Sequence, residues 1–201
     1  MERSTTAREG AVRRALVFAL NFVKHPRMVG TFAVSSPALV RRLLDPTRWS
    51  GVGLGLELGP GVGTITGAML ARMRPDARLL AIEMNRDFVA ELGRQFPDPR
   101  LQVAHGSAAD LQLHLRQAGF EGADLVVSGI PFSTMPPAIR DRTLDAVASA
   151  LRPAGTFLVY QYSAKVLPHL VRRFGEVERE REWRNLVPVH VFRCRAPLAG
   201  P

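Results

Sequence analysis

The residues best placed to do chemistry are an acid and three glycines in one short segment. Residues 57–63 read Glu-Leu-Gly-Pro-Gly-Val-Gly, and they follow a predicted strand and precede a predicted helix. Gly59, Gly61 and Gly63 let the backbone turn tightly and approach a ligand with no Cβ in the way. The helix behind the loop begins with free N–H groups. This context favours a ligand-binding loop over a plain tight turn.

The spacing of the loop discriminates among ligands. A dinucleotide site needs G-x-G-x-x-G to seat a pyrophosphate, and a phosphate-cradling loop carries G-K-S/T. This chain has G-x-G-x-G led by the acid Glu57. An acid at that place opposes a polyphosphate and suits a cation. S-adenosylmethionine carries a sulfonium and an α-amino group, so we expect it as the ligand, with Glu57 acting directly or through water.

A second acid, Glu83, closes the apolar run RLLAIE. An acid at the end of the second strand can accept hydrogen bonds from both ribose hydroxyls, as in dinucleotide sites. An isolated glutamate there would instead be a helix-cap residue. Together with the glycine loop, Glu83 is predicted to bind the ribose, and the adjacent Met84 is assigned to the same cofactor site.

Residues after the third and fourth predicted strands complete the expected site. Ser107 and the backbone of Ala108 could contact the edge of the adenine ring, but Ser107 fits equally well as the N-cap of the next helix. Ser128 is assigned to the cofactor. Ile130 and Pro131 follow it at the carboxyl end of the fourth strand, where ligands of open α/β sheets bind, so we place them beside the methyl group. The alternative is an ordinary turn.

Two tyrosines end the fifth predicted strand, GTFLVYQY. Tyr160 and Tyr162 could hold a cationic amine by cation–π attraction worth about 0.5–2 kcal/mol. Alternate residues of a strand are often core, so only one of the two need lie near the site. No general base is evident, although an alkyl ammonium with a pKa near 10 must lose a proton before it can attack.

Strand and helix patterns alternate from residue 53 onward, and they predict an α/β fold. The expected strands are 53–58, 78–82, 101–104, 123–127 and 155–162, and the expected helices are 65–73, 86–96, 109–118, 137–151 and 164–174. Five such units indicate a parallel sheet with helices on both faces. Two last strands, 177–183 and 186–195, predict an antiparallel hairpin at one edge, joined at Arg184-Asn185.

The first part of the chain reads as a separate helical segment. Residues 12–24 form an amphipathic pattern with a wide apolar arc and a narrow cationic arc, which suits a lipid interface but equally a helix packed on a core. Ser36-Pro37 predicts the start of a helix that reaches about Leu44. We therefore divide the chain into an N-terminal helical segment, 1–48, and a cofactor-binding domain, 49–201.

Composition narrows the expected cellular location and the expected binding partners. The chain has 201 residues and a net charge of +9, and its basic residues are all arginine except Lys24 and Lys165. Such a surface attracts nucleic acid, anionic lipid or phosphorylated substrates, although nucleotide bias in the source explains it equally well. With one cysteine, Cys194, and no secretory signal, the expected setting is cytoplasmic, with peripheral contact at an anionic membrane. No metal is expected.

Taken together, these segments resemble the class I S-adenosylmethionine-dependent methyltransferases. The resemblance spans about residues 50–196, and it implies a Rossmann-like, mostly parallel seven-stranded sheet with an antiparallel last strand. It also implies that Glu57–Gly63 is the glycine-rich cofactor motif and Glu83 the ribose-binding acid. The product would be S-adenosylhomocysteine.

A narrower resemblance covers nearly the whole chain. The segments FVKHPRMVGTFAVSS, ELGPGVG, VVSGIPFS, YQYS and REWRNLVPVHVFRC are similar, in order, to the bacterial phospholipid N-methyltransferase group. That group methylates the amine of phosphatidylethanolamine, which implies a lipid amine substrate at a membrane surface.

One departure bears on the alternatives. Many nucleic-acid amino-methyltransferases carry Asn/Asp-Pro-Pro-Tyr, in which the first side chain accepts a bond from the target amine. Here Gly129 occupies that place and has no side chain, which weakens an adenine-N6 rRNA activity, while Phe132 could still stack on a base. A methyltransferase of a soluble small molecule and a catalytically idle adaptor module are the remaining alternatives.

Overall fold

The computed structural model describes residues 35–196, which lie within one compact unit. Helix α3 (Pro37–Leu44) begins as predicted, since the Ser36 hydroxyl accepts a hydrogen bond from the Leu39 N–H at 3.1 Å. Leu39, Leu43 and Leu44 are buried in the core. Residues 37–44, grouped above with segment 1–48, thus pack in the same unit as the sheet. The helix expected at 12–24 lies outside the described residues.

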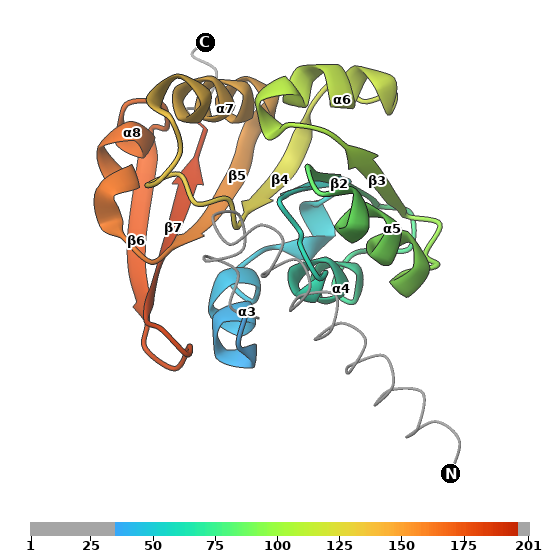
Figure 1. Ribbon diagram of the computed structural model, residues 1–201, viewed down its shortest axis with the longest axis horizontal. Coiled ribbons are helices and arrows are strands. Elements are labelled where there is room, and N and C mark those ends of the chain that lie inside the picture. Colours follow the sequence, from blue (N-terminus) through green and yellow to red (C-terminus); the bar gives the residue numbers. More distant parts are fainter. Residues whose placement is uncertain (1–34, 197–201) are drawn as a thin grey trace. The chain divides into compact units, whose positions relative to one another are not determined.

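The strands form one seven-stranded sheet in the order β3-β2-β1-β4-β5-β7-β6 (Figure 1). The neighbours from β3 to β5 pair in parallel, while β7 runs antiparallel to both β5 and β6. The predicted mostly parallel sheet with an antiparallel last strand is confirmed. The strands are β1 (Leu54–Leu58), β2 (Arg78–Glu83), β3 (Leu101–His105), β4 (Ala123–Ser128), β5 (Leu151–Gln161), β6 (Glu176–Glu182) and β7 (Val189–Arg195).

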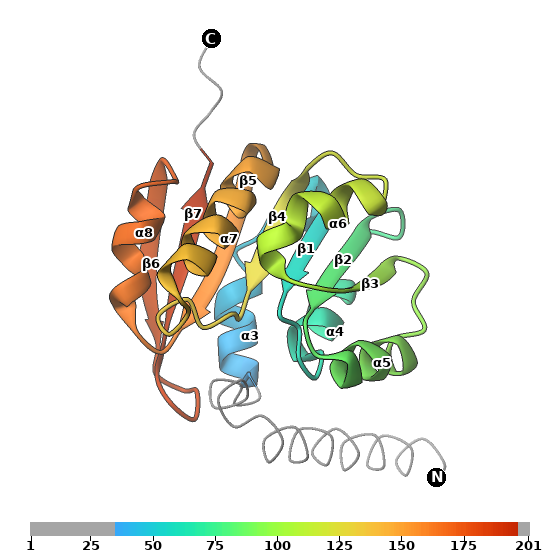
Figure 2. The ribbon, with the colours of Figure 1, turned by 45° about the horizontal axis from the view of Figure 1, so that its top comes forward.

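Helices cover both faces of the sheet (Figure 2), as the alternation predicted. One face carries α3, α4 (Thr64–Leu70) and α5 (Arg86–Gln95), and the other carries α6 (Leu111–Gln117), α7 (Pro137–Ala150) and α8 (Leu167–Val171). Short 3₁₀ turns lie at Trp49–Gly51, Ala108–Asp110 and Ala164–Val166. Within residues 35–196, no helix is long and apolar enough to cross a bilayer.

Side chains alternate between the two faces of the sheet, so strand residues divide between two hydrophobic cores, and the alternation along β1 sets the direction of Glu57. Leu54, Leu56 and Leu58 of β1 join the core under α6–α8. Gly55 and Glu57, which alternate with them, face α4 instead, and Met69 of that helix packs over Gly55. Glu57 is therefore directed toward α4 by strand periodicity.

Several element boundaries differ from the sequence predictions, including those of β5, α8 and the last hairpin. Strand β5 begins at Leu151 instead of 155, with a register shift opposite β4 and a positive φ of 62° at Ala154. The helix predicted over 164–174 is a 3₁₀ turn followed by α8, which starts with Pro168 in its first turn. The last hairpin is joined by residues 183–188, a longer connection than the predicted turn at Arg184-Asn185.

Candidate cofactor and methyl-transfer site

Backbone hydrogen bonds join the loops at the carboxyl edge of the sheet. The Gly59 N–H donates to the Ile82 carbonyl at 2.9 Å, and the Gly106 N–H donates to the Glu83 carbonyl at 2.9 Å. The Gly129 N–H donates to the Leu58 carbonyl at 3.3 Å. The loops that follow β1, β3 and β4 therefore converge, and with them the segments that the sequence analysis singled out.

The glycine loop needs glycine for its backbone conformation. Gly59, Gly61 and Gly63 have φ values of 72°, 56° and 81°, a region that other residues rarely adopt. A Cβ at Gly63 would also lie 2.8 Å from a Leu92 methyl group, against α5. The loop is thus a tight turn held close to its neighbours, with no side chain on three of its positions.

Glu83 holds this loop from the end of β2. Its side chain is 7% exposed, and its two oxygens accept hydrogen bonds from the Gly61 N–H at 3.1 Å and the Asn85 N–H at 2.8 Å. Burial raises the pKa of the Glu83 carboxyl, while the backbone hydrogen bonds act in the opposite direction. The adjacent Met84 is 61% exposed, so its thioether is available to a ligand.

Glu57 is buried without a positive partner among the described residues. It is 3% exposed, and its carboxylate accepts a hydrogen bond from the Thr66 hydroxyl at 2.6 Å. Burial raises the pKa of Glu57 to about 8, and the negative charge of Glu83 adds to the rise, while the Thr66 bond opposes it. A buried acid whose pKa is raised in this way fits a cationic ligand, because a cation would favour its ionised form.

Ser107 and Ser128 serve the backbone in this structure. The Ser107 hydroxyl accepts from the Ala109 N–H at 3.2 Å as the N-cap of the 3₁₀ turn, the second of the two roles considered above, and Ala108 is buried beside it. Ser128 is fully buried, and its hydroxyl accepts from the Ile130 N–H at 3.2 Å. Both serines shape loops at the predicted site, and any contact they make with the cofactor remains a prediction.

Tyr160 fills the space left by the missing side chain at Gly129. A Cβ built on Gly129 would clash with the Tyr160 hydroxyl and would lie 2.8 Å from its Cζ. The pKa of Tyr160 is raised to about 12, mainly by burial and also by nearby Glu57 and Tyr162, while a hydrogen bond with Ser35 opposes the rise. The phenol is therefore neutral at physiological pH and places a polar oxygen at the Gly129 position.

Gln161 fixes the loop that carries Ile130 and Pro131. Its amide nitrogen donates to the Ile130 carbonyl at 2.6 Å, and the residue is 5% exposed. Because side chains alternate along β5, Gln161 points to one face of the sheet, while Tyr160 and Tyr162 both pack on the α3–α4 core. The structure thus brings both tyrosines to the same face.

The sequence analysis missed three residues that contribute to the candidate site. Thr66 bonds Glu57, Gln161 bonds the Ile130 carbonyl, and Ser35 bonds Tyr160. The only available signal was the polar Gln161 directly after the run Phe-Leu-Val-Tyr. Among residues 35–196, no group of three or more His, Cys, Asp and Glu residues is arranged to hold a metal.

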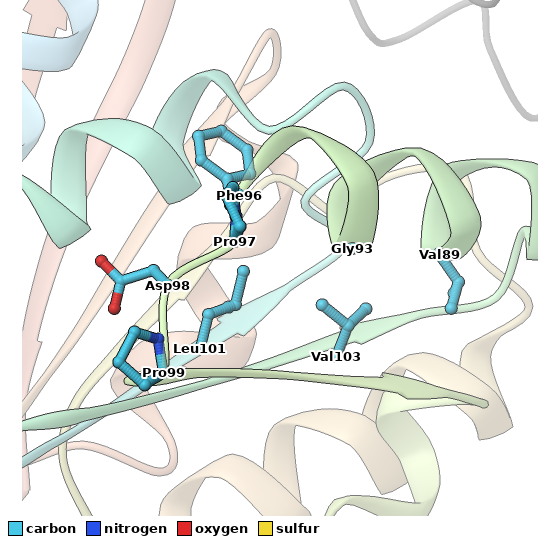
Figure 3. Close-up of a pocket in the computed structure, with 8 residues that line it drawn as sticks. All are labelled: Val89, Gly93, Phe96, Pro97, Asp98, Pro99, Leu101 and Val103. Atoms are coloured by element: carbon cyan, nitrogen blue, oxygen red, sulfur yellow. The ribbon is translucent and has the colours of Figure 1, made fainter.

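A further pocket of about 640 Å³ lies between α5 and the edge strand β3 (Figure 3). It is open to solvent, and Leu101 and Val103 of β3 point toward α5 across it. None of the predicted cofactor residues lines it. Nothing among the described residues indicates what would cover it, so we assign it no role.

Comparison with known proteins decides the family. The chain is 34% identical over 181 residues to an ornithine lipid N-methyltransferase of Singulisphaera acidiphila, which spans 89% of this chain and 94% of that protein. The family described as "Methyltransferase domain" matches residues 56–155. The chain belongs to the class I S-adenosylmethionine-dependent methyltransferases. S-adenosylmethionine is the methyl donor, as predicted.

Two other similarities to this methyltransferase are shorter or more distant. A ribosomal RNA small subunit methyltransferase A of a Synechococcus species is 39% identical over 83 residues, which is 41% of this chain and 29% of that protein. The solved structure of the N-methyltransferase NodS from Bradyrhizobium japonicum, in complex with S-adenosylhomocysteine, superposes with a TM-score of 0.64. It covers 81% of this chain and 89% of its own at 18% identity, which confirms the fold.

Proposed function

We propose that this methyltransferase transfers a methyl group to the primary amine of a membrane lipid headgroup, of the phosphatidylethanolamine or ornithine lipid kind. The observation that carries the proposal is the match along 94% of a lipid N-methyltransferase, whereas the rRNA methyltransferase of Synechococcus matches over 29% of its length. In the donor site, Glu57 and Glu83 lie beside the glycine loop, and we assign them to the cationic methionine part and the ribose.

The donor supplies an electrophilic methyl group on a sulfonium. The lipid amine attacks that carbon, so a C–N bond forms as the S–C bond breaks, and the neutral thioether S-adenosylhomocysteine leaves. The amine must be unprotonated when it attacks, and its second proton is lost to water after transfer. The protein's contribution is to hold the amine in line with the methyl group.

Tyr160 is the residue that we assign to hold the amine. Its neutral phenol oxygen lies where Gly129 lacks a side chain, so it can accept a hydrogen bond from the amine N–H. A flexible headgroup needs no aromatic platform, which distinguishes it from a flipped base. Gln161 acts as a positioning residue, because it holds the Ile130 carbonyl beside this point.

The test is methyl transfer from labelled S-adenosylmethionine to vesicles that contain either phosphatidylethanolamine or ornithine lipid. We expect label in at least one lipid and none in ribosomal RNA. Tyr160→Phe should lower kcat about tenfold to hundredfold, the range for a lost hydrogen bond to the reacting group, with the Kd for S-adenosylhomocysteine within about twofold of wild type. Label in RNA, with both lipids unlabelled, would overturn the proposal.

A further inference from the structure

The connection between β6 and β7 exposes large apolar side chains at the end of the sheet. Residues 183–188, Trp-Arg-Asn-Leu-Val-Pro, are named the hairpin tip here. Exposed fractions are 64% for Trp183, 86% for Leu186 and 49% for Val187. Single exposed apolar residues are common on protein surfaces, but three in one short connection form an exposed apolar patch of the kind that indicates a binding surface.

The hairpin tip is held in place by the body of the protein. Asn185 is 6% exposed, and its side-chain oxygen accepts a hydrogen bond from the Ser36 N–H at 3.0 Å, while its amide nitrogen donates to the Val187 carbonyl at 3.0 Å. Below the tip, Arg42 of α3 pairs with Glu182 at 2.8 Å. The apolar side chains are thus presented on a fixed support.

Charges around the tip suit an anionic surface. Residues 183–188 contain no acid, and Arg184 lies among the apolar residues. The Arg181 guanidinium lies 4.3 Å from the centroid of the Trp183 ring. Of the nearest acids of β6, Glu180 pairs with Arg42, and Glu182 pairs with both Arg42 and Arg184. A tryptophan and aliphatic residues with arginines beside them match the interface of an anionic bilayer.

The tip lies at the same edge of the sheet as the candidate site. Gln161 of β5 and Arg181 of β6 both pair with His190 of β7, so β5 and β6 end at the same level. The connection projects past the ends of the strands in both views (Figures 1 and 2). A bilayer that received the tip would therefore face the edge that carries Tyr160 and Gly129.

We propose that the hairpin tip inserts into the headgroup region of an anionic phospholipid bilayer and orients the carboxyl edge of the sheet toward the lipids. The inference builds on the proposed lipid substrate, because it gives that substrate a route to the site. Membrane insertion is nevertheless measurable without turnover, so the two proposals can fail separately.

The chain offers its own reporter for the test. It has two tryptophans, and in the full-length Trp49→Phe variant Trp183 is the one that remains. Trp183 fluorescence is recorded as this variant is titrated with vesicles of phosphatidylglycerol and phosphatidylcholine, 1:1, and with the same vesicles containing brominated acyl chains. We expect a blue shift and quenching with the anionic vesicles, and weaker changes with pure phosphatidylcholine.

Substitution then tests the apolar wedge by sedimentation with the same vesicles. Leu186→Ser in the otherwise wild-type chain should weaken vesicle partitioning by about fivefold to tenfold, because a leucine in the headgroup region gains only part of the free energy of complete transfer to an apolar phase. Leu113→Ser, on α6 and 45% exposed, is the matched control and should stay within about twofold. Circular dichroism checks that both variants are folded.

Two results would overturn the inference. One is vesicle binding with Trp183 neither shifted nor quenched, which would place the membrane contact elsewhere on the chain. The other is a concentration-dependent dimer, seen by sedimentation velocity, that Leu186→Ser abolishes while vesicle binding is unchanged; the tip would then contact a second copy. Lipid methylation that persists in either case would leave the proposed function intact.

Discussion

Two regions of the molecule each bury a glutamate, and they treat its charge in opposite ways. Glu57, at the end of β1, is 3% exposed, and Glu182, at the end of β6, is 1% exposed. The pKa of Glu57 is raised to about 8 by burial, whereas hydrogen bonds from Arg184 and Arg42 lower the pKa of Glu182 to about 2. The partners differ, because Glu57 has the neutral hydroxyl of Thr66 and Glu182 has two guanidinium groups.

This difference in pKa indicates that the two glutamates have different roles, one in ligand binding and one in structure. Glu182 already has its countercharges, and it ties β6 to α3 through Arg42. Glu57 has none among the described residues and lies beside the glycine loop, so the charge it lacks is the kind that a cationic methyl donor brings. We therefore infer that Glu57 belongs to the cofactor site and that the fully paired Glu182 is a structural contact.

The largest effect is expected from Glu57→Gln. Loss of the charge should weaken binding of S-adenosylhomocysteine, which keeps the α-ammonium group, by about tenfold to two-hundredfold, the range for hydrogen bonds to charged groups. The free energy of unfolding without ligand should match or exceed that of wild type at pH 6. The wild-type carboxyl is neutral when folded and ionises on unfolding, which favours the unfolded chain, whereas glutamine stays neutral in both states. Calorimetry and urea unfolding provide the two measurements. Unchanged affinity with reduced stability would reverse the assignment.

Glu182→Gln should show the opposite pattern. Removing this charge leaves Arg42 with Glu180 alone and Arg184 without its carboxylate partner, and it should lower the free energy of unfolding by about 1–3 kcal/mol at pH 7. Affinity for S-adenosylhomocysteine should remain within about twofold. The same urea and calorimetry measurements serve here. A stable variant that fails to bind ligand would break the comparison.

The pH dependence gives a smaller effect that sharpens the same contrast. The raised pKa of Glu57 adds stability below its unfolded value near 4.5, and this contribution is lost as pH rises through about 8. The lowered pKa of Glu182 adds stability above about 4.5, and this is lost as pH falls through about 2. Relative to wild type, Glu57→Gln should therefore gain stability as pH rises from about 4.5 to about 8, as followed by urea unfolding.

Ligand binding should also release a proton from Glu57. At pH 7 the free carboxyl is mostly protonated, and a cation would ionise it, so up to about one proton should leave per ligand bound. Calorimetry of S-adenosylhomocysteine binding in phosphate and in Tris measures this number, and Glu57→Gln is the control that should release none from this site. Equal release by both proteins would assign the proton to another group.

Much of the fold was predictable because its signals are local. Period-two and helical patterns, with glycines at turns, located each strand of the sheet to within a few residues, except at the start of β5 and in the last hairpin. There the register shift near Ala154 and the contact of Asn185 with Ser36 depend on partners elsewhere in the chain. A strand boundary that a distant partner sets has no local signal.

The sequence by itself determined which residues form the glycine loop, that acids lie at the ends of β1 and β2, and that Gly129 lacks an accepting side chain. Only the tertiary structure decided that Tyr160 occupies the Gly129 position and that Gln161 holds the Ile130 carbonyl. It also decided that Glu182 has two countercharges, while Glu57 has none within residues 35–196. Backbone preferences depend on neighbours along the chain. The pKa of a carboxyl and the occupancy of a vacant position depend on atoms that folding brings together from distant segments.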